Sequence, residues 1–256
     1  MPRKLISYNV NGIRAAHRKG LLDWMSEVDP DVVCIQETKA QPGDVGEGLF
    51  APEGYKGYWH SAEKKGYSGV AIWTKEEPLH VEVGCGIEKY DREGRVLRLD
   101  FKDYSIMSLY LPSGSSGDER QAFKDVFLID FHKYIAELKK EVPRMIISGD
   151  YNICHRAIDI HNPKSNKNSS GFLEHERAWV TDFLDLGFKD SFRELNPDPD
   201  YYTWWSYRAN ARNNNKGWRI DYHMVDEEIA DRCLETRIYK DALHSDHAAL
   251  ELVIDL

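Results

Sequence analysis

The chain has 256 residues, of which 41% are hydrophobic and 30% are charged, so it holds enough apolar side chains for a sizeable buried core. Its formal net charge of −9 argues against a protein that coats nucleic acid by charge alone, because such a protein would be basic. The apolar runs are too short for a membrane span, and the first run is too short for a signal peptide. We therefore expect a soluble, cytoplasmic protein with no membrane partner.

Short apolar runs, many of them rich in Val, Ile and Leu or flanked by Gly and Asp, predict β-strands along the whole chain. The expected strands are Lys4–Tyr8, Asp31–Gln36, Tyr55–Trp59, Gly69–Trp73, His80–Val83, Val96–Phe101, Tyr104–Leu111, Arg144–Ser148, Tyr202–Tyr207, Arg219–Val225 and Ala248–Ile254.

Three longer segments predict helices, namely Arg14–Glu27, Asp118–Glu141 and Leu173–Leu186. In the middle segment, large apolar side chains recur every three or four residues, which indicates a helix packed against the core rather than a cofactor site. This stripe consists of Phe123, Phe127, Phe131, Tyr134 and Leu138.

No linker rich in Pro, Gly or Ser divides the chain, so residues 1–256 are expected to form a single domain of the α/β type. The longest segment without periodicity is Tyr151–Gly171, and a loop of that length is usually functional or disordered. The four cysteines are scattered and include no CxxC pair, which favours buried free thiols in a reducing compartment.

Polar side chains stand at the ends of several predicted strands. Taken singly, each has an ordinary explanation as a turn former, a helix cap or a packed tyrosine. Because the strands of one sheet end side by side, residues at six strand ends are expected to converge on one site. They are Asn9, Asn11, Glu37, Tyr110, Asp150, Asn152, Asp221, Asp246 and His247.

This set offers many oxygen ligands, few nitrogen ligands and no cysteine, which suits Mg²⁺ or Mn²⁺ rather than a structural Zn²⁺. A hard cation beside an imidazole and a free carboxylate suits phosphoester hydrolysis. A net negative charge is compatible with such an enzyme, since the cation and not the chain holds the phosphate. The candidate oxygen ligands are Asn9, Glu37, Asp150, Asn152 and Asp246.

Other chemistries lack their motifs. The chain contains no GxxxxGK[ST] loop and no GxGxxG after a strand, which disfavours nucleoside triphosphates and dinucleotides. The run GYSG at Gly66–Gly69 lacks the GxSxG spacing of a serine nucleophile.

Over nearly its whole length the chain resembles the exonuclease III-type apurinic/apyrimidinic endonucleases, which belong to the deoxyribonuclease-I-like phosphodiesterases. The resemblance implies a four-layer α/β sandwich, in which two mixed β-sheets pack face to face with helices outside. The segments that carry it, in order, are NVNGIRA, QETK, KGYSGVA, YLPSG, GDYNICHRAIDIHNPK, GFLEHERAW, TWWSYR, NKGWRIDY and SDH.

The resemblance also implies roles for single residues. Glu37 matches the principal metal carboxylate, with Asn9 and Asp246 near it, and His247 is a further candidate ligand of the metal. Asp150 matches the residue that activates water or protonates the leaving group, and whether it or His247 is the general base stays open. The remaining matches are Asn152 as a donor to the scissile phosphate, Asp221 as the partner that orients His247, and Tyr110 as a phenol aimed at the phosphate.

By the same resemblance, Trp204 and Trp218 are walls of a pocket for a flipped-out sugar that lacks its base. Tryptophans paired in a strand are more often core residues, so this role competes with a structural one. Arg208 matches a residue inserted into the duplex. The residues that match rim contacts to backbone phosphates are Arg14, Lys39, Tyr67 and Asn166.

The implied function is a Mg²⁺-dependent DNA repair enzyme, with Mn²⁺ as a substitute ion, that cuts the backbone 5′ to abasic sites. It would also trim 3′ ends or act as a 3′→5′ exonuclease. Its partner would be duplex DNA with abasic sites or 3′-blocked ends, bound by a monomer. Two departures, Ser113 and Ser169, stand where relatives have Asn near phosphate, so the grip on DNA is expected to differ there.

Two alternatives remain. A phosphatase or phosphodiesterase of the same superfamily could act on inositol phosphates or lipid head groups, and a non-catalytic binding module could use the same fold. The aromatic segment TWWSYR beside the basic run Arg208–Lys216 favours DNA over a small head group. The complete set of acid, base and ligand types disfavours a module without catalysis.

Overall fold

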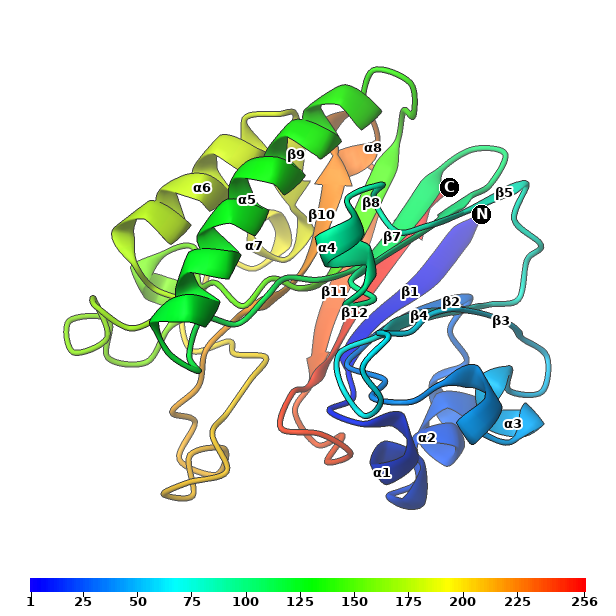
Figure 1. Ribbon diagram of the computed structural model, residues 1–256, viewed down its shortest axis with the longest axis horizontal. Helices are drawn as coiled ribbons and strands as arrows, with labels where there is room; N and C mark the ends of the chain where they lie inside the picture. Colours follow the sequence, from blue (N-terminus) through cyan, green and yellow to red (C-terminus); the bar gives the residue numbers. More distant parts are fainter.

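Two β-sheets pack face to face in the computed structural model, which describes residues 1–256 (Figure 1). Each sheet has six strands, and in each only one central pair is parallel, namely β1 with β2 and β7 with β8. In order across the first sheet, the strands are β11 (Cys233–Tyr239), β12 (Ala249–Asp255), β1 (Pro2–Asn9), β2 (Val32–Gln36), β4 (Val70–Thr74) and β3 (Lys56–His60). Across the second they are β5 (His80–Val83), β6 (Val96–Asp100), β7 (Ser105–Tyr110), β8 (Met145–Asp150), β10 (Asp221–Asp226) and β9 (Phe188–Asp190).

Helices cover the outer faces of both sheets, so the predicted four-layer sandwich of two mixed sheets is confirmed (Figure 1). The first sheet is covered by α1 (Ile13–Arg18) and α2 (Leu21–Val28), and the second by α5 (Asp118–Leu138) and α6 (Glu174–Leu184). The remaining helices are short: α3 (Glu47–Phe50), α4 (Glu88–Asp91), α7 (Ser191–Leu195) and α8 (Glu227–Ala230), with 3₁₀ turns at Pro42–Asp44 and Ala157–Asp159.

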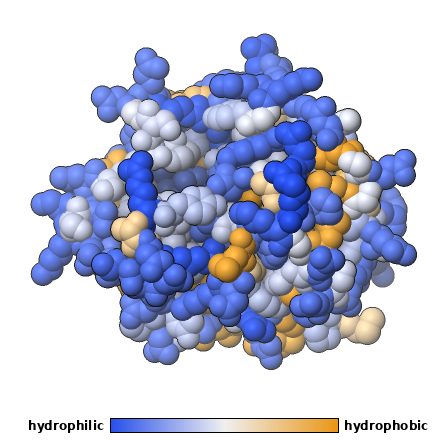
Figure 2. Space-filling model, turned by 90° about the horizontal axis from the view of Figure 1, so that it is seen from below, coloured by the Kyte–Doolittle hydropathy of each residue, from blue (hydrophilic) through white to orange (hydrophobic).

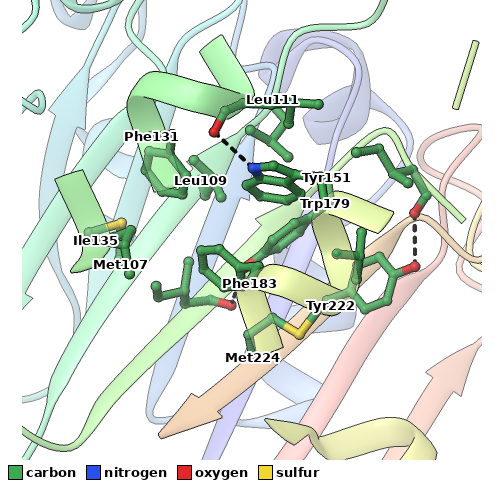
Figure 3. Close-up of a cluster of buried hydrophobic side chains, with 14 of the residues drawn as sticks. Met107, Leu109, Leu111, Phe131, Ile135, Tyr151, Trp179, Phe183, Tyr222 and Met224 are labelled. Carbon is green, nitrogen blue, oxygen red and sulfur yellow. Dashed lines mark hydrogen bonds between the residues drawn. The ribbon is translucent and has the colours of Figure 1, made fainter. Parts of the chain in front are cut away.

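Alternation along the central strands divides the apolar side chains between the layers. On β8, Ile146 packs between the two sheets, whereas Ile147 faces α5 and α6. Figure 3 shows this outer cluster, in which Phe131 of α5 and Phe183 of α6 contact the sheet. Full burial of one such side chain contributes roughly 1.5–3 kcal/mol, so the cluster is enough to hold both helices on the sheet. The predicted stripe on α5 is confirmed as core packing.

Two predicted elements were wrong, and two strands were missed. The helix expected at Arg14–Glu27 is two helices, because the chain turns at Gly20, whose φ of 90° lies in the left-handed region. The strand expected at Tyr202–Tyr207 is irregular and forms only single bridges through Trp204. Strands β9 and β11 escaped prediction because β9 has three residues and β11 is a largely exposed edge strand without an apolar run.

All four cysteines are free, as expected. Cys34 and Cys154 are fully buried, whereas Cys85 and Cys233 are partly exposed, so the prediction of burial holds for only two of the four. No helix combines the length and apolar character needed to cross a membrane.

A buried histidine links the two sheets below the strand ends. The Nε2–H of His223 on β10 donates to the carbonyl of Leu250 on β12 at 3.0 Å, and Ser148 Oγ donates to its Nδ1 at 2.7 Å. This arrangement requires a neutral imidazole, since a protonated Nδ1 could not accept. Burial lowers the pKa of His223 to about 4.

We expect this histidine to make the fold sensitive to acid. The unfolded chain takes up a proton near pH 6.5 and the folded chain only near pH 4, so stability falls as the pH drops through this interval. The loss attributable to His223 is about 3 kcal/mol. Urea unfolding of the parent and of His223→Gln should therefore show a steeper decline for the parent between these pH values. Equal slopes would contradict the assignment.

Candidate active site

The register of the two parallel strand pairs brings the predicted site residues together. In the first sheet Asn9 at the end of β1 pairs with Gln36, so Glu37 follows beside it. In the second sheet Asp150 at the end of β8 pairs with Tyr110 on one side and with Asp221 on the other. Both pairs end at the same edge of the sandwich, so the predicted convergence of these strand ends is observed.

Three ligand-type side chains meet at this edge. Atoms of Glu37, Asp150 and His247 lie within 4.8 Å of one another, and only Glu37 is not fully buried. The amide of Asn9 connects the two carboxylates, because its Nδ2 donates to Glu37 Oε1 at 2.9 Å and to Asp150 Oδ2 at 2.8 Å. The cluster thus joins one carboxylate from each sheet.

His247 lies between two carboxylates. Its Nδ1 donates to Asp221 Oδ2 at 2.9 Å, and its Nε2 lies 3.8 Å from Asp150 Oδ2. Burial opposes a charge on the ring, but the charge and hydrogen bond of Asp221, and then the charge of Asp150, outweigh it and raise the pKa of His247. The imidazole is therefore held as a charged group at neutral pH.

The pKa of Asp150 is shifted upward as well. Burial is the main cause, followed by the negative charge of Asp221, whereas the charge of His247 acts in the opposite direction. Burial also opposes ionisation of Glu37, but Lys39, whose Nζ lies 2.7 Å from Glu37 Oε2, lowers the pKa of that carboxyl. In addition, Asp221 Oδ1 is buried without a hydrogen-bond partner. Buried carboxylates that repel one another, with a free oxygen among them, fit a divalent cation.

Asn152 and Tyr110 flank this cluster. Asn152 has a φ of 52°, its backbone N–H donates to Asp150 Oδ1 at 2.8 Å, and its Nδ2 donates to the carbonyl of Leu111 at 2.9 Å. Burial and the nearby charge of Glu37 raise the pKa of Tyr110, which keeps its phenol protonated as a donor. The guanidinium of Arg95 lies over the Tyr110 ring at 4.8 Å.

Two of the expected ligands are placed differently. The Oδ1 of Asn9 accepts from the backbone N–H of Asn11 at 3.0 Å, so Asn9 presents a donor to the cluster and not the expected oxygen. The carboxylate of Asp246 accepts from Asn11 Nδ2 at 2.9 Å and from Trp204 Nε1 at 3.0 Å. Asp246 thus orients a pocket wall, a role that strand-end reasoning could not indicate.

A cavity of about 740 Å³ opens beside the cluster. Trp204 and Trp218 line it and meet edge to face, with ring centroids 6.0 Å apart, whereas the neighbouring Trp205 is 2% exposed and belongs to the core. Of the two adjacent tryptophans in the sequence, Trp204 is therefore a cavity wall and Trp205 is a core residue. The lining residues that the sequence did not single out are Gly114, Ser115, Gly117, Asp118, Gln121, Asn168, Ser170, Gly171, Leu173 and Ile220.

The two departures, Ser113 and Ser169, also line the cavity. Ser113 Oγ is hydrogen bonded to Ser115 Oγ at 2.9 Å, and Ser169 Oγ donates to Asn166 Oδ1 at 3.4 Å. The loops that carry them touch, because a Cβ on Gly114 would lie 2.6 Å from Ser170 Oγ.

Apart from the two tryptophans, the candidate DNA contacts lie outside the lining of the cavity. Arg14 and Lys39 line a smaller hollow of about 300 Å³ next to the cluster. Arg208 is exposed, and the irregular segment 206–217 that contains it projects from the sandwich (yellow-orange in Figure 1). Tyr67 accepts from Arg95 Nη2 at 3.2 Å, so it shares the cation that lies over Tyr110. Asn166 donates to the carbonyls of His161 and Asn162 and stabilises its own turn.

Figure 2 shows the molecule from the side of the strand ends and their loops. This face is largely hydrophilic and hollowed, and only a few hydrophobic side chains reach it. A polar, concave surface suits a charged polymer better than an apolar partner.

The chain matches the endonuclease/exonuclease/phosphatase family over residues 6–247. It is 46% identical to an exodeoxyribonuclease of Bacillus subtilis, over 99% of this chain and 100% of that protein. It is also 41% identical to the DNA repair nuclease APEX1 of Danio rerio, over 98% of this chain and 82% of that protein. The solved structure of an AP endonuclease from Archaeoglobus fulgidus superposes with a TM-score of 0.90 at 30% identity, covering 99% of this chain and 100% of that one.

The chain therefore belongs to the endonuclease/exonuclease/phosphatase family. The nearer resemblance to the exonuclease III-type apurinic/apyrimidinic endonucleases is confirmed by these full-length relatives, and the enzyme is a hydrolase of that type.

The Asp221–His247 pair leads to a prediction on pH dependence. Asp221→Asn keeps a hydrogen-bonding group at the same place but removes the charge, so the pKa of His247 should fall. We expect the limb of the pH–rate profile that reports this imidazole to move to lower pH, while affinity for DNA changes little. Single-turnover rates across pH measure the shift. A profile that superimposes on the parent's would assign Asp221 a purely structural role.

Proposed function

We propose that this chain is a Mg²⁺-dependent DNA repair phosphodiesterase that cuts the backbone 5′ to abasic sites and trims 3′ ends. The observation that carries the proposal is the juxtaposition of the Glu37–Asp150–His247 cluster and a cavity walled by two indoles. The names of the full-length relatives, a DNA repair nuclease and an exodeoxyribonuclease, support DNA as the substrate. The enzyme acts as one domain over residues 1–256, as a cytoplasmic monomer.

Glu37 and Asp150, with His247 beside them, would hold the ion, and their oxygen-rich donor set suits Mg²⁺, with Mn²⁺ as a substitute. Asn152 and Asp246 line the same cavity and would lie beside the bound ion, and Asn9 is the donor that spaces the carboxylates. Bound there, the ion would polarise a phosphoryl oxygen.

Side chains of the cluster would carry out proton transfer and stabilise negative charge on the phosphate. We assign the proton transfer to Asp150, because it lies at the centre of the cluster with its Oδ2 3.8 Å from His247 Nε2. His247 stays charged beside Asp221 and stabilises negative charge on the phosphate, so it is not the general base. Asn152 and Tyr110 supply further donors to the same phosphate.

The two indoles select the substrate. An ordinary nucleotide must be unstacked before it leaves the duplex, at a cost of a few kcal/mol, whereas an abasic sugar avoids most of that cost. Trp204 and Trp218 then contact the extruded sugar, and Arg208 enters the gap that it leaves. Arg14, Lys39, Tyr67 and Asn166 hold the flanking backbone on the hydrophilic face.

An inositol phosphate or a lipid head group fits the cavity less well. Such a ligand carries several phosphates or hydroxyls and would need cations within the pocket, yet its lining contains no Lys or Arg. Nicking of a duplex with one abasic analogue, in parallel with an intact duplex and an inositol phosphate, separates these substrates. Hydrolysis of the inositol phosphate alone would overturn the proposal.

We expect Glu37→Gln to lower the nicking rate by orders of magnitude, because the neutral amide is a weaker ligand. High Mg²⁺ should restore part of the rate, whereas the parent is already saturated. Titration of nicking with Mg²⁺ measures this difference. An unchanged dependence on Mg²⁺ would show that Glu37 does not hold the ion.

Trp218→Ala should lower the preference for abasic DNA more than it lowers the rate of phosphodiester cleavage itself. We expect incision of the abasic duplex to fall more than removal of an unhindered 3′ end, which needs less closure of the pocket. The matched control is Trp205→Ala, which removes the neighbouring core indole and should lower both activities in proportion. If Trp218→Ala behaves like that control, the abasic preference has another origin.

A further inference from the structure

A lysine is completely buried next to the proposed site. Lys124 projects from α5 with 0% exposure, and its Nζ donates to the backbone carbonyl of Asn152 at 2.9 Å and to Glu176 Oε1 at 2.6 Å. Glu176, on α6, is also 0% exposed. Lys124 is the only charged residue on the buried face of α5, beside Phe127, Leu128, Phe131 and Ile135, so apolar packing does not explain its burial.

The carbonyl that Lys124 binds belongs to a residue in the left-handed region. Asn152 adopts a φ of 52°, a conformation that asparagine tolerates better than most residues and that a hydrogen bond to its carbonyl helps to fix. The same residue aligns Asp150 through its backbone N–H and reaches Leu111 through its side chain. A donor on the Asn152 carbonyl therefore fixes the peptide that orients both Asn152 and Asp150.

The other end of the ion pair holds the wall of the cavity. Glu176 Oε2 accepts from the backbone N–H of Gly171 at 2.7 Å and of Leu173 at 3.0 Å, and both residues line the cavity. Gln121, another lining residue, donates to Glu176 Oε1 at 3.2 Å. One ion pair thus connects the segment after β8 with the cavity-lining loop beside Trp218.

Stability alone does not account for this ion pair. Replacing a buried pair by apolar residues of similar volume is often neutral or stabilising, since both charges lose their hydration. The position of the pair, between the carbonyl of Asn152 and the cavity wall, accounts for it better.

We propose that Lys124 and Glu176 are positioning residues that hold Asn152 and the 171–173 loop in the geometry required for phosphodiester cleavage. This inference rests on the proposed role of Asn152.

The test compares five variants in single-turnover nicking of an abasic duplex. Lys124→Met removes the donor and should lower the rate by about 10- to 100-fold with little change in KM. Lys124→Arg keeps a charged donor and should recover most of the rate. Lys124→Met combined with Glu176→Gln removes both charges, so it should regain stability in urea unfolding while the rate stays low. Recovery of the rate together with stability would overturn the proposal.

Lys139→Met is the matched control. Lys139 Nζ also donates to a backbone carbonyl, that of Gly187 at 2.7 Å, and pairs with the buried Asp226 at 3.1 Å, but it lies away from the cavity. This variant should lose stability and keep its rate, and a Lys124→Met rate equal to it would refute the inference. Asn152→Ala in the same assay separates the two proposals: full activity there refutes the role of Asn152 itself, whereas an inactive Asn152→Ala beside a fully active Lys124→Met refutes only the positioning role.

Discussion

The two hydrogen bonds from the Asn9 amide are the contacts on which the rest of the site depends. They draw a carboxylate from each sheet onto one side chain, Glu37 from the first sheet and Asp150 from the second. Without this donor two buried carboxylates would face each other, and the repulsion would be relieved by protonation or by separation of the sheets. The polar ties below it, such as His223 to Leu250 and Gln36 to Ser108 at 3.2 Å, hold the sheets at the same spacing.

The repeated strand pattern explains why the site lies where it does. Each sheet places one parallel pair at its centre, and parallel strands end together at one edge. The second sheet thus brings Tyr110 and Asp150 to one edge, and the antiparallel β10 brings the start of its strand, Asp221, to the same place. The termini lie at the opposite end of the sandwich (Figure 1), so the site is built from strand ends and from the turns that follow them.

Most strands and the group of site residues could be predicted from the sequence. The orientation of single side chains within the site could not, because tertiary contacts determine it. Strand runs and the α5 stripe follow from local periodicity, and the convergence of Glu37, Asp150 and His247 follows from strand ends. Periodicity carries no information on the direction of a side chain at a turn, so the donor role of Asn9 and the contact of Asp246 with Trp204 could not be predicted. The same holds for Lys124, because periodicity does not show that this lysine pairs with a buried glutamate of another helix.

The net charge of the chain and its proposed substrate can be reconciled by where the charges lie. Carboxylates are concentrated at the cluster, whereas Arg14 and Lys39 line the neighbouring hollow and Arg208 stands on the projecting loop. Electrostatic attraction to a phosphate falls off within about 10 Å at moderate ionic strength, so the local distribution outweighs the formal total of −9. An acidic enzyme can therefore hold a polyanion if cations border its site and a divalent ion compensates its centre. The net charge of −9 argues against a protein that coats nucleic acid, but it is consistent with a nuclease whose cations are placed around its site.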